Sequence, residues 1–378
     1  MRMNEQVERA AAALRGHGLD AALLTSPHNV CYVGGYAAPI EAGPSPFAGG
    51  PSVALLDAGG RVTLIVPDIE EDAARAHGQA DAVVAYPAFG YRARHDQRAN
   101  AWAALRRVLR ETGTTRGALG VEDTTLPRSL ERAILADFEA LRLEDATAAL
   151  AEARLVKTPG EIAILRRAIG LTAVGQEAAR HLLRPGTTEI ALFAGLRGAM
   201  EDAAGRRLPV AGDLVAGADR TANIGGWPLG RTIEEGDLVL VDLAPRLDGY
   251  WGDSCNTLCA GEPTAEHRRM LRATTEALAK GVAAARPGLR AAELDRVCRG
   301  HVEGFGYAYP HHSGHALGTT VHESPRLVPY EGMPLQTGMV LALEPAAYVP
   351  GVGGVRSEHV ILVTEGDAEM LSSFAHGF

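Results

Sequence analysis

The amino-acid sequence predicts two domains of different class, an α/β unit over residues 1–150 followed by an α+β unit over residues 151–378. Three observations lead to this prediction. Helix-like and strand-like stretches alternate through the first part of the chain, two hairpin signals occur in the last third, and an Arg-Pro-Gly motif recurs between expected helices. A chain of 378 residues with 46% hydrophobic content can bury two such cores.

The N-terminal unit is expected to open with a helix over residues 6–15 and a strand over residues 20–25. Short apolar runs predict further strands at residues 53–56, 61–66, 82–86 and 118–121, with amphipathic helices in the gaps. The segment from Gly34 to Pro51 is rich in Gly, Pro and Ala, which predicts a long surface loop. This loop would cover an active site, contact a dimer partner or be an ordinary insertion.

A weak internal repeat marks the C-terminal unit. Residues 183–186, Leu-Arg-Pro-Gly, follow one expected helix and introduce another, and residues 285–288, Ala-Arg-Pro-Gly, do the same. The two arginines are 102 positions apart, as 286 is from 184. The motif also occurs at unrelated helix ends, so by itself it only suggests two similar halves.

The first hairpin signal surrounds Asp242, which ends the apolar run 238–241. Asp248-Gly249 is a two-residue turn signal, and a second strand is expected from Tyr250. A turn centred between these two residues places Asp242 opposite Cys255. Asp253 is then a diagonal neighbour on the same face of the hairpin.

The second hairpin signal has the same logic. The strand 340–343 leads into Glu344, and a Gly-rich turn over residues 350–354 precedes Glu358. If the turn is centred on Gly351, Glu344 and Glu358 face each other. His315, in a Ser-Gly-His-Ala-Leu-Gly segment, lies between the two hairpins in sequence and offers a nitrogen ligand.

These positions together predict a metal site. Each acid alone is more simply a solvated residue or an ion-pair partner, but unrelated surface acids need not obey strand parity in two hairpins. Four carboxylates and one imidazole suit manganese, cobalt, iron or zinc, and paired carboxylates favour two ions. The expected ligands are Asp242, Asp253, His315, Glu344 and Glu358.

The same residues lie in motifs that resemble one known family, that of methionine aminopeptidase, aminopeptidase P, prolidase and creatinase, and most of all bacterial Xaa-Pro dipeptidases. The resemblance begins near residues 154–161 and runs to near the C-terminus; its motifs are residues 236–242, 248–253, 313–318, 321–323, 343–345 and 354–358. It implies the pita-bread fold, in which two pseudo-symmetric halves of antiparallel strands and helices enclose two divalent ions, most often Mn²⁺. It also implies that residues 1–150 form the creatinase-like N-terminal domain.

The resemblance implies a dinuclear hydrolase that cleaves Xaa-Pro bonds at the N-terminus of dipeptides or short peptides through a metal-bridging hydroxide. Glu344 is the expected general base and His322 the expected stabiliser of the oxyanion. His322 lies seven residues after His315, and Arg326 lies four residues further on, where a guanidinium would hold a substrate carboxylate. The expected substrate contacts are His311, His322, Arg326 and Arg356.

Two departures from the family pattern bear on the substrate. The histidine that usually lies seventeen residues before the first ligand is replaced by Gly225, and Cys255-Asn256-Thr257 replaces the usual Thr-Arg-Thr. Thr257 or the Cys255 thiol is therefore expected to orient Asp253. Gly225 supports an alternative, a metal-dependent amidohydrolase of a small non-peptide substrate, similar to ectoine hydrolase. A non-catalytic binding module is a third hypothesis, which the complete ligand set disfavours, as it does a metal-free creatinase.

Composition excludes other classes of function. The formal charge is −9 and no cluster of Lys and Arg resembles a nucleic-acid site, so neither DNA nor RNA is an expected partner. The N-terminus has no apolar signal region and no stretch is long enough to span a bilayer, which predicts a cytoplasmic protein. The four cysteines are expected to be reduced. The family resemblance suggests a homodimer.

Overall fold

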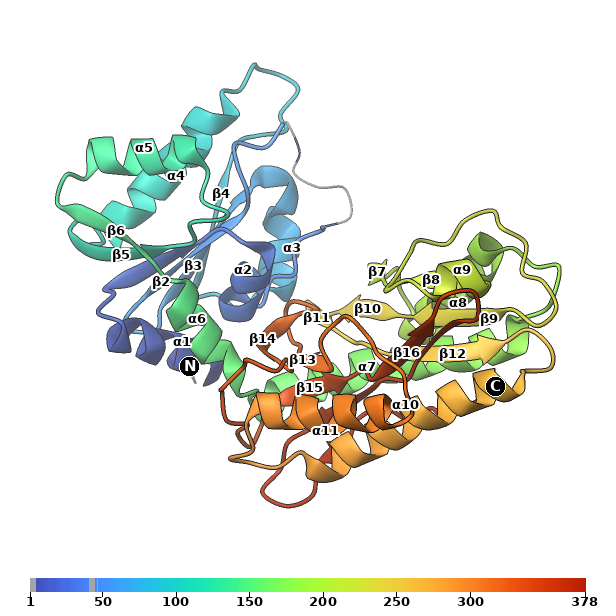
Figure 1. Cartoon of the computed structure of the whole chain (residues 1–378). Helices are drawn as coiled ribbons and strands as arrows, with labels where there is room; N and C mark the ends of the chain where they lie inside the picture. Colours follow the sequence, from blue (N-terminus) through green and yellow to red (C-terminus); the bar gives the residue numbers. More distant parts are fainter. Residues whose placement is uncertain (1–4, 41–44, 46) are drawn as a thin grey trace. The chain divides into compact units, whose positions relative to one another are not determined.

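The computed structural model describes residues 5–40, 45 and 47–378. The chain divides between Arg154 and Leu155 into two compact units, each with its own core (Figure 1). The sequence predicted an α/β unit followed by an α+β unit, and the structure confirms this prediction.

The N-terminal unit is built on a six-stranded sheet of order β4-β3-β2-β1-β5-β6. Strands β1 to β3 pair antiparallel, whereas β3–β4, β1–β5 and β5–β6 are parallel pairs. The strands are β1 (Ala21–Leu24), β2 (Val53–Asp57), β3 (Val62–Pro67), β4 (Ala82–Tyr86), β5 (Gly117–Val121) and β6 (Leu141–Asp145). The helices are α1 (Glu5–Gly16), α2 (Pro27–Gly34), the short 3-10 turn η1 (Asp68–Glu70), α3 (Glu71–His77), α4 (Gln97–Glu111), α5 (Arg128–Asp137) and α6 (Thr147–Leu155).

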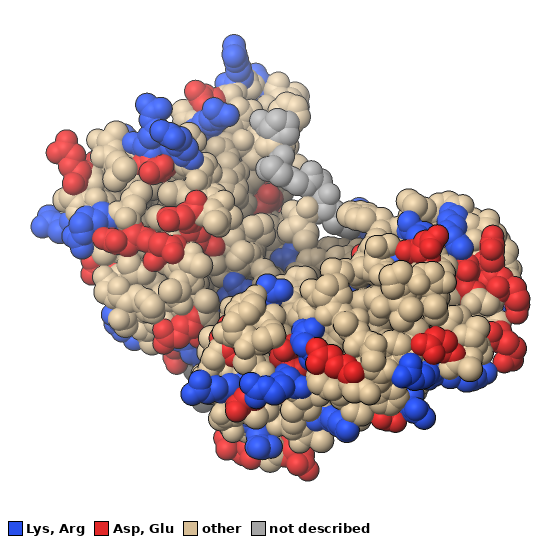
Figure 2. All heavy atoms as spheres, in the orientation of Figure 1, with Lys and Arg blue, Asp and Glu red and all other residues tan. Residues whose placement is uncertain are grey.

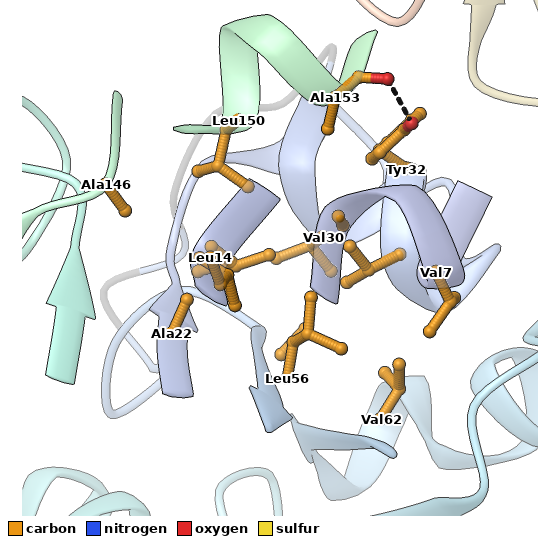
Figure 3. Packing of buried hydrophobic residues seen from close by; sticks show 14 of the residues in the cluster. Val7, Leu14, Ala22, Val30, Tyr32, Leu56, Val62, Ala146, Leu150 and Ala153 are labelled. Atoms are coloured by element: carbon orange, nitrogen blue, oxygen red, sulfur yellow. Dashed lines mark hydrogen bonds between the residues drawn. The ribbon is translucent and has the colours of Figure 1, made fainter. Parts of the chain in front are cut away.

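Both faces of this sheet are buried, which explains why its central strands are continuous apolar runs. Leu56 packs into a core with α1, α2 and α6, whereas its neighbour Leu55 packs on the opposite face with α4 and α5. Figure 3 shows the first of these cores, in which the Tyr32 hydroxyl donates to the Ala153 carbonyl oxygen at 2.8 Å. That hydrogen bond satisfies the single polar atom of a large buried ring.

The five strands expected in this unit are present, but β6 and α2 were not predicted from the sequence. Strand β6 is a sheet edge with mostly exposed side chains, so it has no apolar run that would reveal it. The expected loop from Gly34 to Pro51 lies partly outside the described residues, at 41–44 and 46. Residues 35–40 and 47–52 contain no helix or strand.

The C-terminal unit combines antiparallel sheets with paired helices. Its helices are α7 (Pro159–Leu182), α8 (Glu189–Ala204), α9 (Ala218–Thr221), α10 (Ala265–Ala284) and α11 (Ala291–Gly304). Its strands are β7 (Val210–Ala211), β8 (Leu214–Ala216), β9 (Leu238–Asp242), β10 (Ala244–Leu247), β11 (Tyr250–Trp251), β12 (Cys255–Cys259), β13 (Gly314–Ala316), β14 (Glu323–Arg326), β15 (Val340–Leu343), β16 (Ala346–Val349), β17 (Gly353–Arg356), β18 (His359–Leu362) and β19 (Glu369–Met370). The strands form a five-stranded sheet of order β14-β13-β15-β18-β19, two three-stranded sheets of orders β12-β9-β8 and β11-β10-β7, and the pair β16-β17.

Helix α7 begins where the sequence provides a capping box. The Thr158 side chain accepts from the Glu161 amide, and the Glu161 carboxylate accepts from the Thr158 amide, with Pro159 in the first helical position. Just before the helix, the buried Lys157 ammonium lies 2.9 Å from the buried Glu323 carboxylate on β14. This ion pair connects the segment before α7 to β14, an edge strand of the five-stranded sheet.

The repeat expected from the Arg-Pro-Gly motifs is confirmed in the backbone. The Gly186 amide donates to the Ile233 carbonyl oxygen at 2.9 Å. The Gly288 amide donates to the Leu335 carbonyl oxygen at the same distance, and both of these residues lie 102 positions after their counterparts, as 288 is from 186. The bridges of Thr188 with Thr232 and of Arg290 with Pro334 repeat this spacing. The unit therefore consists of two similar halves.

This duplication extends to the strands that end near the expected metal site. Strands β9 and β15 begin 102 positions apart, and so do β10 and β16, as 340 is from 238 and 346 from 244. Asp242 is the last residue of β9 and Glu344 directly follows β15, so the two acids hold equivalent places, each just before the next strand of its own half. Each half delivers one carboxylate to the same region.

The expected register is confirmed in both hairpins. Asp242 pairs with Cys255, and Asp248 and Gly249 form the turn with positive φ angles of 49° and 86°. Leu343 pairs with His359, and Ala346 with Arg356, so the ladders on both sides of the glutamates keep the register that sets residue 344 opposite residue 358. Asp253 lies in the short break between β11 and β12.

The described part of the chain contains no helix that is both long and apolar enough to cross a membrane. On the surface that Figure 2 shows, Lys and Arg side chains are interspersed with Asp and Glu side chains over each unit. No broad basic face is visible there.

We predict that Gly249→Ala lowers the free energy of unfolding by about 1 kcal/mol, because Ala is strained at positive φ. Gly300→Ala is the matched control, since Gly300 lies within α11 and an added Cβ there has no neighbour within 4 Å. Urea unfolding followed by circular dichroism should show a loss for the first variant and no loss, or a small gain, for the second. Equal stabilities would contradict the turn geometry.

Candidate metal centre

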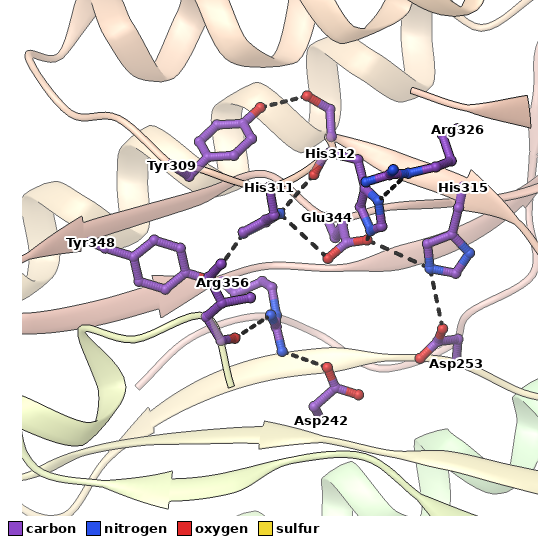
Figure 4. A network of polar contacts seen from close by, with 12 residues as sticks. Asp242, Asp253, Tyr309, His311, His312, His315, Arg326, Glu344, Tyr348 and Arg356 are labelled. Atoms are coloured by element: carbon purple, nitrogen blue, oxygen red, sulfur yellow. Dashed lines mark hydrogen bonds and ion pairs between the residues drawn. The ribbon is translucent and has the colours of Figure 1, made fainter. Parts of the chain in front are cut away.

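The five expected ligands converge in the C-terminal unit. Figure 4 labels Asp242, Asp253, His315 and Glu344. One group, in which each residue offers an atom within 4.8 Å of the others, contains Asp253, His315 and Glu358. A second group contains Asp242, Cys255 and Glu358. Glu358 belongs to both groups, so its carboxylate joins the two clusters.

Glu344 completes the arrangement. Its Oε1 atom lies 3.6 Å from His315 Nε2, and Asp253 Oδ2 lies at the same distance from that nitrogen (Figure 4). The backbone holds Glu344 in place, because its amide donates to the Ser313 carbonyl oxygen at 2.9 Å. Two carboxylates from different hairpins thus face one imidazole nitrogen.

The tautomer of His315 leaves that nitrogen free. His315 Nδ1 lies 3.0 Å from the Ala316 carbonyl oxygen, which can only accept, so the proton is on Nδ1. Nε2 then presents its lone pair to Asp253 and Glu344. Burial lowers the pKa of His315 to about 4, which keeps the ring neutral at physiological pH. A backbone carbonyl that fixes the tautomer is a common partner of metal-ligating histidines.

Glu358 is the strongest indication that a cation belongs here. Its side chain is 2% exposed, and its Oε1 atom has no hydrogen-bond partner within the described part of the chain. The Glu358 amide donates to the Cys255 carbonyl oxygen at 2.9 Å, so the backbone fixes this orphaned carboxylate inside the cluster. A buried carboxylate with an unpaired oxygen is costly unless a cation completes it.

The cluster is over-supplied with negative charge. Burial, and then repulsion from neighbouring carboxylates, raises the pKa of Asp253 and of Glu358 well above the usual range, and burial raises that of Asp242 to about 7. Glu344 is the exception. Burial opposes its ionisation, but the hydrogen bond from His312 and the nearby His315 lower its pKa to about 2. This donor set fits hard or borderline divalent cations, which would remove the repulsion.

Arg356 supplies an internal countercharge. It is buried, and its Nη2 atom donates to Asp242 Oδ2 at 2.5 Å, while Nη1 donates to the Ile224 carbonyl oxygen at 2.9 Å. Asp213 Oδ2 lies 3.7 Å from the same Nη2 atom. Arg356, expected as a substrate contact, therefore pairs with an expected ligand in this structure.

The other expected substrate residues lie around Glu344. His311 uses both ring nitrogens within the protein, on the His312 carbonyl oxygen at 2.7 Å and on the Tyr348 hydroxyl at 3.0 Å. The His322 ring centroid lies 4.3 Å from that of His315, on the more exposed side of the cluster. Burial lowers the pKa of His322, so its ring is a neutral donor.

Gly225 lies against an acidic side chain that the sequence did not bring to attention. A Cβ atom added at Gly225 would be 2.1 Å from Asp213 Oδ2, so the Asp213 carboxylate occupies the space that a side chain at position 225 would need. The Asp242 amide donates to the Asp213 carbonyl oxygen at 2.8 Å. The missing histidine is thus matched by an acid held beside Arg356 and Asp242.

The partner expected for Asp253 is corrected by the structure. The Thr257 hydroxyl accepts from the Arg356 amide at 3.0 Å and donates to the Arg356 carbonyl oxygen at 3.2 Å, so it ties β12 to β17. Asp253 instead accepts from the Ser254 amide. The Cys255 thiol lies beside Asp242 and Glu358, and burial raises its pKa well above the usual value, so it stays protonated.

Sequence reasoning missed His312. Its Nε2 atom lies 2.8 Å from Glu344 Oε1, and its Nδ1 atom accepts from Arg326 Nε at 3.1 Å (Figure 4). With His315 and His322 it forms a group of three imidazoles. The signal was the concentration of three histidines within residues 311–315, in a chain that has 13.

Two family models match the chain. Residues 163–365 match the metallopeptidase family M24, and residues 6–156 match the creatinase/prolidase N-terminal domain.

Curated proteins and solved structures resemble the chain over its whole length. It is 29% identical to an Xaa-Pro dipeptidase from Pyrococcus furiosus, with 98% of each chain covered. An Xaa-Pro dipeptidase structure from Bacillus anthracis is 26% identical with a TM-score of 0.83, covering 99% of this chain and 98% of that one. The prolidase structure from Pyrococcus horikoshii OT3 is 26% identical with a TM-score of 0.80 and 99% coverage of both chains. The pita-bread fold expected from the sequence is confirmed.

We predict that metal stabilises the protein increasingly as the pH rises from about 7 to about 8. The carboxyl groups of Asp242, Asp253 and Glu358 have raised pKa values in the folded metal-free protein. A carboxyl group with a raised pKa stabilises the folded state relative to the unfolded chain while it is protonated. That contribution to the free energy of unfolding is complete below the pKa of the unfolded chain, about 4, and is lost as the pH rises through the pKa of the folded protein. Histidines contribute little in this window, since they are mostly neutral in both states there.

The test is thermal unfolding of chelator-treated and Mn²⁺-saturated samples at both pH values. The metal-free midpoint should fall between the two, while the Mn²⁺-saturated midpoint should change less. A metal-free midpoint that stays level or rises would contradict the proposed cluster of buried, repelling carboxyl groups.

We predict that Gly225→Ala destabilises the protein by about 1 kcal/mol and that Asp213→Ala removes most of that cost, because the two side chains compete for one space. Gly230→Ala is the control in the same segment, since an added Cβ there meets nothing within 4 Å. Denaturant unfolding of the single and double variants gives the coupling energy. Strictly additive effects would show that Asp213 does not restrict position 225.

Proposed function

Because the chain belongs to the metallopeptidase family M24, we propose that it is a dinuclear-metal hydrolase that cleaves Xaa-Pro bonds at the N-terminus of dipeptides or short peptides. The Pyrococcus furiosus and Bacillus anthracis relatives, which are named Xaa-Pro dipeptidases, support this substrate class, as they align over nearly their whole length.

One observation carries the proposal. The free Nε2 of His315 faces Asp253 and Glu344 from two hairpins, beside the orphaned carboxylate of Glu358. In a packed core without cations, this group of buried carboxylates would destabilise the folded state. We propose that Asp242, Asp253, His315, Glu344 and Glu358 hold two divalent ions, for which Mn²⁺ is the first choice and Co²⁺, Zn²⁺ or Fe²⁺ are alternatives. When bound, such ions supply Lewis acidity and lower the pKa of a water molecule.

Glu344 is the proposed general base. Its lowered pKa keeps the carboxylate ionised, and Oε1 already accepts from His312. Oε2 lies 3.8 Å from His311 Nδ1, beyond hydrogen-bonding distance, and His311 donates that proton to the His312 carbonyl oxygen. Oε2 is therefore the oxygen that would take the proton of the attacking water and return it to the leaving imino nitrogen.

His322 and Arg326 are the proposed substrate contacts on the open side of the cluster. A neutral His322 would donate to the oxygen of the scissile carbonyl group as negative charge develops there. Arg326 is exposed, and its Nε atom is occupied by His312, so its two terminal nitrogens would form a fork for the free carboxylate of a dipeptide. His311 and Arg356 would then support the site through Tyr348 and Asp242 rather than touch the substrate.

A metal-dependent amidohydrolase of a small non-peptide substrate is the second candidate. The observation that favours it is the Asp213 carboxylate beside Gly225, where the resemblance leads one to expect a histidine. A substrate with a cationic group in place of a peptide would find an acidic partner there.

The proposal extends to the setting in which the enzyme works. The four cysteines, which all lie in the described part of the chain, form no disulfide with one another, and this supports a reducing compartment such as the cytoplasm. We also propose a homodimer, on the family resemblance alone.

We predict that Mn²⁺-loaded protein releases proline from Ala-Pro and Leu-Pro, and that Glu344→Gln lowers kcat by at least about 100-fold, because the base is lost. Arg326→Ala should raise KM for Ala-Pro more than for a longer Xaa-Pro-Pro substrate, whose carboxylate lies further from the scissile bond. Arg268→Ala, an exposed α10 variant, is the control.

The assay is chromatographic detection of free proline, or of the cleaved N-terminal residue for the longer substrate. Absence of cleavage of all three peptides by protein that binds two Mn²⁺ ions would defeat the peptidase proposal and favour the non-peptide amide substrate.

A further inference from the structure

Beyond the proposed ligands, a hydrogen-bonded chain connects the exterior of the site to its centre. Arg326 Nε lies 3.1 Å from His312 Nδ1, and His312 Nε2 lies 2.8 Å from Glu344 Oε1 (Figure 4). The chain thus runs from an exposed guanidinium through a largely buried imidazole to the buried carboxylate proposed as the general base.

The hydrogen-bonding partners of His312, Arg326 and Glu344, determine which of its ring nitrogens carries the proton. Arg326 Nε can only donate, so His312 Nδ1 must accept and cannot carry a proton. The single ring proton is therefore on Nε2, which donates to Glu344 Oε1. His312 is thus a neutral donor to the carboxylate, and its Nε2 lone pair is not available to a cation in this arrangement.

The position of Arg326 links this chain to the substrate. Arg326 pairs with His315 across β14 and β13, so its side chain starts from the strand next to the proposed ligand. Its Nε is committed inward to His312, which leaves the terminal nitrogens as the outward donors. A carboxylate held by those nitrogens would immobilise the guanidinium and with it the acceptor role of His312 Nδ1.

We propose that His312 is a positioning residue that couples the binding of a substrate carboxylate at Arg326 to the orientation of Glu344. This inference rests on the proposed function for the identity of the substrate, but the hydrogen-bonded chain itself does not. It makes hydrolysis fastest for substrates whose free carboxylate reaches Arg326, since a bound carboxylate would immobilise the guanidinium and so keep the Arg326–His312–Glu344 hydrogen bonds in the arrangement that the structure shows.

The kinetic test compares Ala-Pro with its carboxyl-amidated form, which has no negative charge to offer. His312→Ala should lower kcat for Ala-Pro by about 10- to 100-fold, the usual loss for a residue that supports a ligand from outside, with a small change in KM. On the amide the same substitution should lower kcat by a clearly smaller factor, because a guanidinium without a bound carboxylate is mobile and keeps its hydrogen bond to His312 for only part of the time.

Variants of the chain sharpen this test. His312→Gln should restore most of the Ala-Pro rate, because an amide offers a donor toward Glu344 and an acceptor toward Arg326. His312→Ala combined with Arg326→Ala should be no slower than the worse single variant on Ala-Pro, since both break one chain. His181→Gln, on the exposed side of α7, is the matched histidine control.

Equal losses on Ala-Pro and its amide, or a failure of Gln to restore the rate, would overturn the coupling role.

A second readout is independent of turnover. In metal-free protein labelled with ¹⁵N-histidine, the signals lost in His312→Gln should report protonated Nε2 and unprotonated Nδ1, with L-proline added as a carboxylate probe. If wild-type protein cleaves no Xaa-Pro substrate, the proposed function fails, but this spectrum still tests whether the hydrogen bonds from Arg326 through His312 to Glu344 exist. Protonation of Nδ1 in its place would overturn the inference.

Discussion

The burial of several carboxylates around one imidazole nitrogen is the constraint on which the rest of the C-terminal unit depends. Asp253 and Glu358 are almost completely buried, and their pKa values are raised because each has lost water and gained like charges. Such a cluster weakens the metal-free protein unless protons or cations neutralise it. The surrounding fold must therefore keep the ligands in fixed positions although their charges repel one another.

Two features of the fold meet this requirement. The halves related by 102 positions place Asp242 and Glu344 at equivalent points. Asp242 is paired in the ladder of β9 with β12, and Glu344 lies between the ladders of β15 with β18 and of β16 with β17. The ladders share backbone contacts across the centre, where the Glu358 amide donates to the Cys255 carbonyl oxygen and Thr257 bonds the Arg356 backbone. Asp242 and His315 lie in strands, and the other three proposed ligands lie in breaks of two or three residues between strands, so none of them is on a long loop.

The acids of the site have different neighbours and therefore different pKa values, and this suits them to different roles. Arg356 neutralises part of Asp242 from within the protein. Glu344 alone has a lowered pKa, because His312 donates to it and His315 lies close by. A carboxylate that stays ionised suits proton transfer, whereas its protonatable neighbours suit a cation. The hydrogen bonds around the site therefore distinguish Glu344 from the three other carboxylates of the proposed ligand set.

The sequence by itself determined the two-domain organisation, the internal repeat and the register of both hairpins. Strand parity, the Asp248-Gly249 turn and the Arg-Pro-Gly motifs are local properties that the chain carries wherever it folds. Register also predicted which carboxylates share a face within each hairpin, and the family resemblance predicted that the two hairpins and His315 meet at one site. Edge strand β6 escaped prediction because its polar residues leave no periodic signal.

Only the tertiary structure decided what surrounds those ligands. His312 reaches Glu344, Asp213 fills the space beside Gly225, and Arg356 turns inward to Asp242, although no local pattern brings these partners together. Side-chain partners of this kind depend on which strands pack against each other across a hundred residues or more. Register can be read along one chain, but the choice of neighbour is made by packing in three dimensions.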